Sequence, residues 1–405
     1  MGRYKVLDLE TTVRNVGDDL QGGGFAASPF HPVNEIVYAG VKNEHDDDVT
    51  IYPKFNPPEL EDDIRLVVGH NIAFDLQYLL MGQNHRLGHL FPQYADWYQW
   101  FHSGGLIWDT MLAEYIISGQ EHKWPSLDFC SEKYGGTLKD DKIKEYWKAG
   151  IATEDIPEDE LKDYLAHDVQ NTELVFLSQL DIAYQQNQVN LIMQMMEARM
   201  ATIKMECNGT FFDKKEAEKE MTEIEGKILG FKNRLETLVE AELPHRVPLD
   251  VMSATQMSKF LLGGIHTYPR DITQYDSEGN VLRFKTGARK GQVKTKKGKA
   301  EVRLEIRVNP VDVGSTMGKN GTWKLDDDIL KAIARARNID PVTLEIVDLM
   351  RKIRKHQKDI TAFYKPYIGM TWHTGLLHPS YQHTNTDTGR LSCVKPNMQQ
   401  SSKKD

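Results

Sequence analysis

The chain has 405 residues, an ordinary apolar content of 40% and a formal net charge of −9. This length predicts two or three domains, and because no run of about 18 apolar residues occurs, a membrane-spanning helix is excluded. The N-terminal sequence lacks the layout of a signal peptide, and the three widely spaced cysteines fit neither a disulfide framework nor a zinc site. We therefore expect a cytoplasmic protein.

Charge is divided unevenly along the sequence. Residues 1–180 contain 31 acidic and 14 basic residues, which gives a net charge of −17. The remaining chain contains 28 acidic and 36 basic residues, which gives a net charge of +8. Concentrated carboxylates can hold metal ions, whereas concentrated Lys and Arg can bind phosphates. The two halves are therefore expected to have different tasks.

The first 180 residues alternate between strand and helix patterns, which indicates an α/β domain. The strands are predicted at 4–8, 36–41, 49–52 and 65–71, and the helices at 72–81 and around 107–118, 126–133 and 158–180.

Strand patterns become rare after residue 185. Helices are predicted at 189–206, 213–243, 253–262, 325–337 and 340–364. Residues 263–323 are rich in Gly, Lys and Thr with short β-like pieces, which indicates an insertion bearing a β-hairpin, and the chain from 371 onward is extended and rich in turns. The predicted domains are residues 1–185, 186–370 and 371–405.

Three short patterns in the first part bring together acidic residues. In VLDLETT, Asp8 and Glu10 are two apart on a strand, so their side chains point to the same face. In GHNIAFD, Asp75 lies in the first turn of a predicted helix, and in YLAHDVQ, Tyr164 and Asp168 are four apart and share one helical face. Each pattern alone also has an ordinary structural explanation, such as a surface acid or an amphipathic helix.

In this order, D-x-E, N-x-x-F-D and Y-x-x-x-D resemble the three exonuclease motifs of the DEDD superfamily, in its tyrosine-bearing branch. The resemblance covers roughly residues 1–180 and implies an RNase H-like (DnaQ-like) fold, a mixed sheet flanked by helices. It also implies a 3′→5′ exonuclease in which Tyr164 orients or helps to deprotonate the attacking water, and two divalent ions (Mg²⁺ or Mn²⁺) are held by Asp8, Glu10, Asp75 and Asp168. Two such ions neutralise the attacking and leaving oxygens during phosphodiester hydrolysis.

Other residues near these motifs are candidates for holding the 3′ end of a DNA strand. Thr11 or Thr12 follows the D-x-E strand and could approach the terminal nucleotide, while Asn71 and Phe74 could contact its sugar and base. Burial of Phe74 in the core is an equally good alternative. We interpret Asp109, in LIWDTMLAEYI, as structural rather than metal-binding.

Two stretches after residue 185 resemble DNA polymerases of the DNA polymerase I family (family A). LIMQMMEARMATIKMECNGTFFD (191–213) resembles the entry to the polymerase region, although periodicity alone predicts a Met-rich core helix. HPSYQHTNTDTGRLSCVKPNMQQ (378–400) resembles the T-x-T-G-R-L-S-S…P-N-x-Q signature, with Cys393 replacing the second serine. The resemblance implies DNA contacts from Thr386, Thr388, Arg390, Ser392, Asn397 and Gln399; a polar surface loop is the ordinary alternative.

The region between these stretches resembles the thumb of the same family, in SATQMSKFLL and in residues 325–368. Residues 281–307 contain ten Lys or Arg against two Glu. We expect this basic segment to grip duplex phosphates, although a solvated basic hairpin is the simpler explanation.

The family's nucleotide-adding aspartates, its nucleotide-gripping helix and its H-D-E turn are not found in the sequence. The resemblance therefore predicts an exonuclease, a thumb and the first strands of a palm. A split gene whose second polypeptide carries the remaining palm and fingers, an amino-terminal fragment, and a free-standing exonuclease are the three alternatives.

Among these alternatives we favour half of a split, phage-type replicative polymerase working in a bacterial or phage-infected cytoplasm. Its partners would be the 3′ end of a primer strand, primer–template duplex and the second polypeptide. A non-catalytic primer–template-binding subunit is the main rival hypothesis, and an RNA-processing exonuclease is a third.

Overall fold

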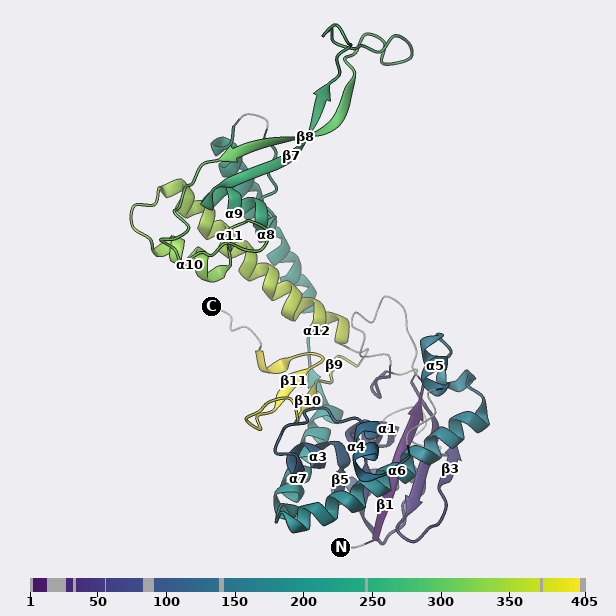
Figure 1. Ribbon diagram of the computed structural model, residues 1–405. Coiled ribbons are helices and arrows are strands. Elements are labelled where there is room, and N and C mark those ends of the chain that lie inside the picture. Colours follow the sequence, from purple (N-terminus) through teal and green to yellow (C-terminus); the bar gives the residue numbers. More distant parts are fainter. Residues whose placement is uncertain are drawn as a thin grey trace. The chain divides into compact units, whose positions relative to one another are not determined.

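The computed structural model describes residues 3–12, 27–31, 34–54, 56–82, 91–137, 142–244, 247–371 and 374–400. The chain forms two compact units, one of Met1–Glu216 with Lys365–Asp405 and one of Ala217–Tyr364 (Figure 1). The division into three domains at residues 185 and 370 stays a prediction. Within the described residues, no helix combines the length and apolar character needed to span a membrane.

The centre of the first unit is a five-stranded mixed sheet of order β3-β2-β1-β4-β5. Its strands are β1 (Arg3–Thr11), β2 (Ile36–Asn43), β3 (Thr50–Pro53), β4 (Ile64–Gly69) and β5 (Leu106–Asp109). β1 pairs antiparallel with β2, where Asp8 lies opposite Gly40, and parallel with β4. β4 is buried at five of its six positions, as expected for a parallel strand covered on both faces.

The long helix α6 (Glu158–Gln185) packs on this sheet and contacts β1, β2 and β4. Its buried residues Leu161, Leu165 and Val169 recur every four positions and so form one apolar face. The other helices of this unit are α1 (Ala73–Gly82), α2 (Gln93–His102), α3 (Thr110–Ile117), α4 (Leu127–Tyr134), α5 (Lys142–Lys148), α7 (Val189–Asn208) and α12 (Lys365–Met370), with short 3₁₀ turns at Thr153–Asp155 and Met398–Gln400.

The extended segment predicted from residue 371 forms small strand pairs in the described part of the first unit. β6 (Thr210–Phe211) pairs antiparallel with β9 (Leu376–Leu377), and β10 (Ser380–Gln382) pairs antiparallel with β11 (Ser392–Val394). Residues 378–400 therefore fold as part of the first unit rather than standing alone.

Two details of the predicted elements are wrong. The helix expected around 107–118 begins only at Thr110, because Leu106–Asp109 forms the strand β5 beside β4. The strand expected at 65–71 ends at Gly69, and the chain then turns through Asn71, whose φ of 53° is left-handed. The helices α2 and α5 were not predicted, although Tyr94, Trp97 and Phe101 of α2 recur at helical spacing.

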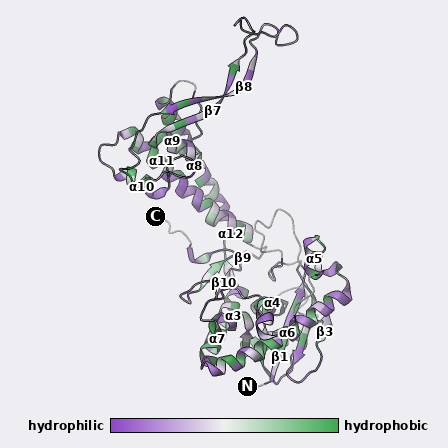
Figure 2. Cartoon of the chain, in the orientation of Figure 1, coloured by the Kyte–Doolittle hydropathy of each residue, from purple (hydrophilic) through white to green (hydrophobic). Residues whose placement is uncertain are grey.

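The second unit is mainly helical and carries one hairpin. Its helices are α8 (Lys214–Glu242), whose first turn belongs to the first unit, α9 (Ala254–Leu262), α10 (Asp327–Arg335) and α11 (Pro341–Asp359), which continues as a π-helical turn, Ile360–Tyr364. Hydrophobic and hydrophilic residues alternate around these helices, and the apolar sides meet in a core that includes Leu261, Leu330 and Ile346 (Figure 2). The hairpin predicted within 263–323 is present as β7 (Gly264–Thr273) and β8 (Thr295–Leu304).

Candidate metal centre and adjoining pocket

Three acidic residues from two elements meet at one point of the first unit. Asp8 and Glu10 lie two apart on β1, and Asp168 lies on α6; one carboxylate oxygen from each lies within 4.8 Å of the other two. Glu10 and Asp168 are buried and Asp8 is half-buried. The strand alternation and the placement of α6 on the sheet thus produce the acidic triad Asp8–Glu10–Asp168.

Asp75 lies beside this triad. It occupies the first turn of α1, and its Oδ1 accepts a hydrogen bond from the backbone N–H of Leu9 at 3.1 Å, between the two acids of β1. Asp75 is only 2% exposed. Burial, and then the negative charge of Asp8, raise the pKa of Asp75 well above its usual range.

Such crowding of buried carboxylates is unfavourable unless protons or cations offset the charge. The triad offers only oxygen donors, the type preferred by hard divalent ions such as Mg²⁺ and Mn²⁺. These residues therefore fit one divalent cation. Ligation by Asp75, and with it a two-ion centre, stays a prediction.

Tyr164 lies one turn before Asp168 on α6. It is half-buried, packs against an apolar cluster that includes Val37 and Ile156, and its ring meets the ring of Trp147 edge to face at 6.0 Å between centroids. His167, by contrast, shares a hydrogen bond with the hydroxyl of Thr137. Packing thus holds Tyr164 on the helical face of Asp168, while its catalytic role stays a prediction.

Asp109 organises the turn that precedes α1. Its Oδ1 accepts hydrogen bonds from the backbone N–H groups of Met111 at 3.0 Å and Leu112 at 3.4 Å, and so caps the N-terminus of α3. The same oxygen accepts a hydrogen bond from the backbone N–H of Asn71 at 3.0 Å, and so also anchors the turn before α1. Asp109 is buried, and burial raises the pKa of its carboxyl. This geometry agrees with our interpretation of Asp109 as structural.

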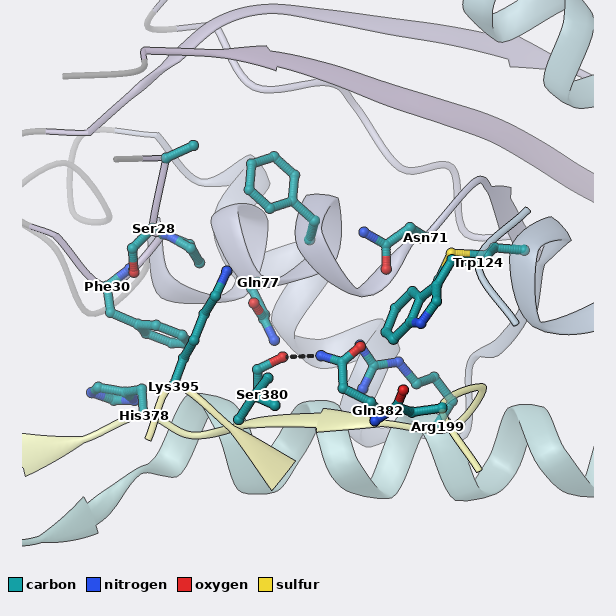
Figure 3. Close-up of a pocket in the computed structure, with 16 residues that line it drawn as sticks. Ser28, Phe30, Asn71, Gln77, Trp124, Arg199, His378, Ser380, Gln382 and Lys395 are labelled. Carbon is teal, nitrogen blue, oxygen red and sulfur yellow. Dashed lines mark hydrogen bonds between the residues drawn. The ribbon is translucent and has the colours of Figure 1, made fainter. Parts of the chain in front are cut away.

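A pocket of about 540 Å³ adjoins the start of α1 (Figure 3). Its walls come from the β4–α1 turn, from α7 and from β10 and β11. Sixteen residues line it: Ala27, Ser28, Pro29, Phe30, Asn71, Phe74, Gln77, Met111, Trp124, Arg199, His378, Ser380, Gln382, Asn385, Val394 and Lys395.

The lining combines aromatic faces, cations and amides. Trp124 is 51% exposed, Lys395 supplies positive charge, and Arg199 is buried and ion-paired with Glu206. Figure 3 shows Gln382 hydrogen-bonded to Ser380 on β10. Stacking surfaces next to cations suit a base and its phosphate.

Two of the residues predicted to contact DNA line this pocket. Asn71 is one, and Phe74 is the other, although Phe74 also packs against the core and meets the ring of Tyr78 at 5.2 Å. Thr11 is buried at the end of β1 and is not among the lining residues. Sequence reasoning missed Trp124 and Arg199, since a single tryptophan in a loop and an arginine inside a Met-rich helix give no local signal.

A buried polar network backs one wall of the pocket. Glu206 on α7 accepts hydrogen bonds from the backbone N–H of Tyr381 at 2.6 Å, from Gln77 Nε2 at 2.5 Å and from Arg199 Nη1 at 3.2 Å. Burial raises the pKa of Glu206, and the charge of Arg199 opposes this. The network joins α1, α7 and β10, and so holds together the pocket walls that these three elements form.

The remaining predicted DNA contacts lie on and after the β10–β11 pair. Thr386 closes the connecting turn, because its Oγ1 donates to the carbonyl of Arg390 at 2.7 Å and its own carbonyl accepts from the Tyr115 hydroxyl at 2.7 Å. Thr388 and Arg390 are exposed. Ser392 lies opposite Gln382 and accepts a hydrogen bond from Asn385 at 2.9 Å.

The last two predicted contacts follow β11. The carbonyl of Asn397 accepts from the Tyr367 hydroxyl at 2.7 Å, and its Oδ1 accepts from the backbone N–H of Gln399 at 3.1 Å. Gln399 is exposed. The structure thus gathers all six signature residues near the β10–β11 pair, and their contact with DNA stays a prediction.

No family model and no curated protein matches the sequence. Among solved structures, the chain is similar to the POL domain of Pol1 from M. smegmatis, a complex with DNA primer–template and dNTP. The TM-score is 0.60 at 12% identity, over 99% of this chain and 52% of that chain. The likeness is one of fold, and the chain spans about half the length of that chain.

Proposed function

We propose that the first unit is a divalent-metal-dependent 3′→5′ DNA exonuclease of the proofreading type. The observation that carries the proposal is the convergence of Asp8, Glu10 and Asp168 within 4.8 Å, with Asp75 beside them. Carboxylates that crowd together out of water favour a bound cation. A metal held there supplies charge neutralisation at a scissile phosphodiester.

The chain's own residues have distinct roles in this proposal. Asp8, Glu10, Asp75 and Asp168 hold the divalent ions. Tyr164 positions the attacking water through its hydroxyl. Asn71, Phe74 and the adjoining pocket hold the unpaired nucleotides at the 3′ end, because the pocket begins at the same helix that carries Asp75.

We further propose that this exonuclease is the N-terminal part of a family A polymerase, with residues 186–370, which include the unit Ala217–Tyr364, as its thumb region. The fold likeness to the polymerase domain and the T-G-R-L-S segment support this. Thr386, Thr388, Arg390, Ser392, Asn397 and Gln399 would contact the primer–template backbone. Because the family's nucleotide-adding aspartates are not found in this sequence, a second polypeptide would supply the residues for nucleotide addition.

The experiment follows a 5′-labelled, single-stranded DNA with Mg²⁺, with Mn²⁺ and with EDTA. We expect stepwise shortening and release of 5′-mononucleotides with either metal, and a loss of at least about 10³-fold in the double variant Asp8→Ala/Glu10→Ala. The matched control is Asp159→Ala/Asp163→Ala, which removes two exposed acids from α6. The control should retain full activity.

The same purified protein also distinguishes the exonuclease from the rival function, which is a non-catalytic subunit that binds primer–template DNA. Wild-type protein that binds primer–template but releases no nucleotide with either metal would establish the rival. Equal activity of Asp8→Ala/Glu10→Ala and wild type would mean that the acidic triad is not the catalytic centre. Preference for an RNA strand would instead indicate an RNA-processing enzyme.

A further inference from the structure

The hairpin of the second unit extends into a long two-stranded arm, which we define as residues 264–304, the basic arm (Figure 1). The strands β7 and β8 pair without interruption from Gly264 opposite Leu304 to Thr273 opposite Thr295. Beyond them the tip continues with bridges between Tyr275 and Val281 and between Arg283 and Val293. The arm is therefore folded over its whole length.

The arm is rooted in the core of the second unit. Leu304 is buried in the apolar cluster with Val302 packed beside it, and the ring of His266 shares a hydrogen bond with the carbonyl of Pro248 at 2.8 Å. Because a ten-residue strand is about 33 Å long, the far end of the ladder stands well away from this root.

The outer part of the arm, residues 271–299, is dominated by positive charge, although it also contains the exposed acids Asp271, Asp276 and Glu278. Residues 283–299 contain eight Lys or Arg and no acidic residue: Arg283, Lys285, Arg289, Lys290, Lys294, Lys296, Lys297 and Lys299. Seven of these are exposed, and Lys294 is half-buried. Within the described part of the chain, only Lys297 has an acidic partner, Asp271 at 3.3 Å.

Solubility and protection of strand edges explain some of these lysines, since edge lysines prevent pairing with other strands. They do not explain the excess of positive over negative charge, because acidic residues serve solubility at least as well and a balanced mixture avoids self-repulsion. The chain as a whole is acidic, with a net charge of −9. In residues 271–299, eight basic residues against three acidic ones leave an excess of five positive charges, which is best explained by a polyanionic partner.

We propose that the basic arm binds the phosphate backbone of double-stranded DNA without reading its sequence. A two-stranded ribbon has the width of the major groove, and side chains on one face of a strand repeat about every 6.7 Å along it. Single-stranded nucleic acid is less favoured, because it stacks on a series of open aromatic rings and the arm exposes one such ring, Tyr275 at 59%. Phe284, an aromatic residue of the tip, is covered by Arg289 and Lys294, at 5.8 and 5.5 Å from its ring.

The test measures binding of a blunt DNA duplex by fluorescence anisotropy at several salt concentrations, in EDTA so that no strand is cleaved. The variant Lys290→Gln/Lys296→Gln/Lys299→Gln removes three exposed charges whose side chains make no ion pair or ring contact within the described residues. The control, Lys148→Gln/Lys204→Gln/Lys227→Gln, removes three exposed lysines outside the arm. A second variant joins Thr273 to Thr295 through Asn-Gly and so removes the tip while keeping the ladder.

We expect the slope of log affinity against log salt to become shallower by up to about 2.7 in the arm variant, at about 0.9 per lost phosphate contact, and to stay unchanged in the control. The tip deletion should weaken binding further. Arm and control variants with equal slopes would overturn the proposal. The proposal would also be overturned if the arm variant bound the DNA duplex as tightly as wild type but no longer bound poly-glutamate. That result would identify an acidic protein as the partner. Exonuclease activity on single strands is a separate readout, so the two proposals fail independently.

Discussion

Gly40 on β2 lies directly beneath Leu165 of α6. A Cβ at position 40 would stand 2.9 Å from Leu165 Cγ and equally close to Val169 Cγ2. Gly40 also lies opposite Asp8 across the β1–β2 pair, and Asp168 immediately precedes Val169. The absence of a side chain at Gly40 therefore sets how closely α6 brings Asp168 to the acids of β1.

Replacing Gly40 with alanine should separate the halves of the acidic triad. Because backbone and packed side chains must move to admit the new methyl group, we expect Gly40→Ala to lower the free energy of unfolding by about 1–3 kcal/mol. Mn²⁺ affinity and exonuclease activity should fall with it. Denaturant unfolding and a metal titration measure both effects.

The matched control is Gly226→Ala on α8, where, among the described residues and apart from the helix's own backbone, a Cβ would have no atom within 4 Å. Alanine there should raise stability by up to about 1 kcal/mol, since glycine is a poor helix former. Unchanged metal affinity in Gly40→Ala would show that α6 does not set the geometry of the triad.

Asp109 is expected to act as a positioning residue for the start of α1. Asp109→Ala leaves the N–H groups of Asn71, Met111 and Leu112 without their acceptor, which should cost roughly 2 kcal/mol or more. Asn71 should then leave its left-handed conformation, and the KM for a DNA strand should rise. Asp109→Asn keeps an acceptor oxygen and should restore most of both properties. If Asp109→Asn were as impaired as Asp109→Ala, the negative charge rather than the hydrogen bonds would matter.

The local part of the site was predictable from the sequence, and the non-local part was not. The face shared by Asp8 and Glu10 follows from the two-residue repeat of a strand, and the position of Asp75 follows from the first turn of a helix. The close approach at Gly40 depends on which strand pairs with β1 and on which helix covers it, and no local pattern encodes that.

The same limit explains the errors in the fold. LIWD is a short apolar run that suits a strand or a helix equally, and only its pairing with β4 decides for β5. The pocket joins Trp124, Arg199 and Lys395 from distant parts of the sequence, and each residue alone has an ordinary explanation. The basic arm was predictable from the numbers of Lys, Arg, Asp and Glu in its sequence, because the net charge of a segment does not depend on how the segment folds.

Trp124 is expected to contribute to binding of single-stranded DNA. Stacking of one base on an aromatic ring is worth about 1–3 kcal/mol, so Trp124→Ala should weaken binding of a short oligonucleotide roughly 5- to 150-fold. The control is Tyr184→Ala, which removes an aromatic ring that is 63% exposed on α6 outside the pocket. Anisotropy in EDTA measures both. Equal loss in the two variants would assign the binding to general surface contacts instead.

Glu206 is expected to be the most sensitive residue of the buried network. Removing it leaves Arg199 charged and buried, and also deprives Gln77 and the backbone N–H of Tyr381 of an acceptor. Loss of one partner of a buried pair costs about 3–5 kcal/mol. Glu206→Ala should therefore unfold the first unit at much lower denaturant than wild type, and the double variant Glu206→Leu/Arg199→Met should recover part of the loss. Failure of the double variant to improve on Glu206→Ala would mean that the hydrogen bonds to Gln77 and Tyr381 dominate.

His383 makes the stability of the first unit depend on pH. Burial, and then the positive charge of Arg199, lower the pKa of His383 to about 4, and its Nε2 shares a hydrogen bond with the Thr202 hydroxyl at 2.9 Å. An unfolded histidine takes up a proton near pH 6.5, so between about pH 6.5 and 4 the unfolded state binds more protons than the folded state. Stability should therefore fall as the pH decreases through this window, by roughly 3 kcal/mol from His383 alone.

The variant His383→Gln isolates this contribution, because glutamine can donate to Thr202 but does not titrate. Denaturant unfolding at pH 7, 6, 5 and 4 should show a smaller loss of stability in the variant than in wild type, with the two curves diverging below about pH 6.5. The carboxylates titrate in both proteins and cancel in the difference. Parallel curves would show that His383 is already protonated, or already accessible to water, in the folded protein.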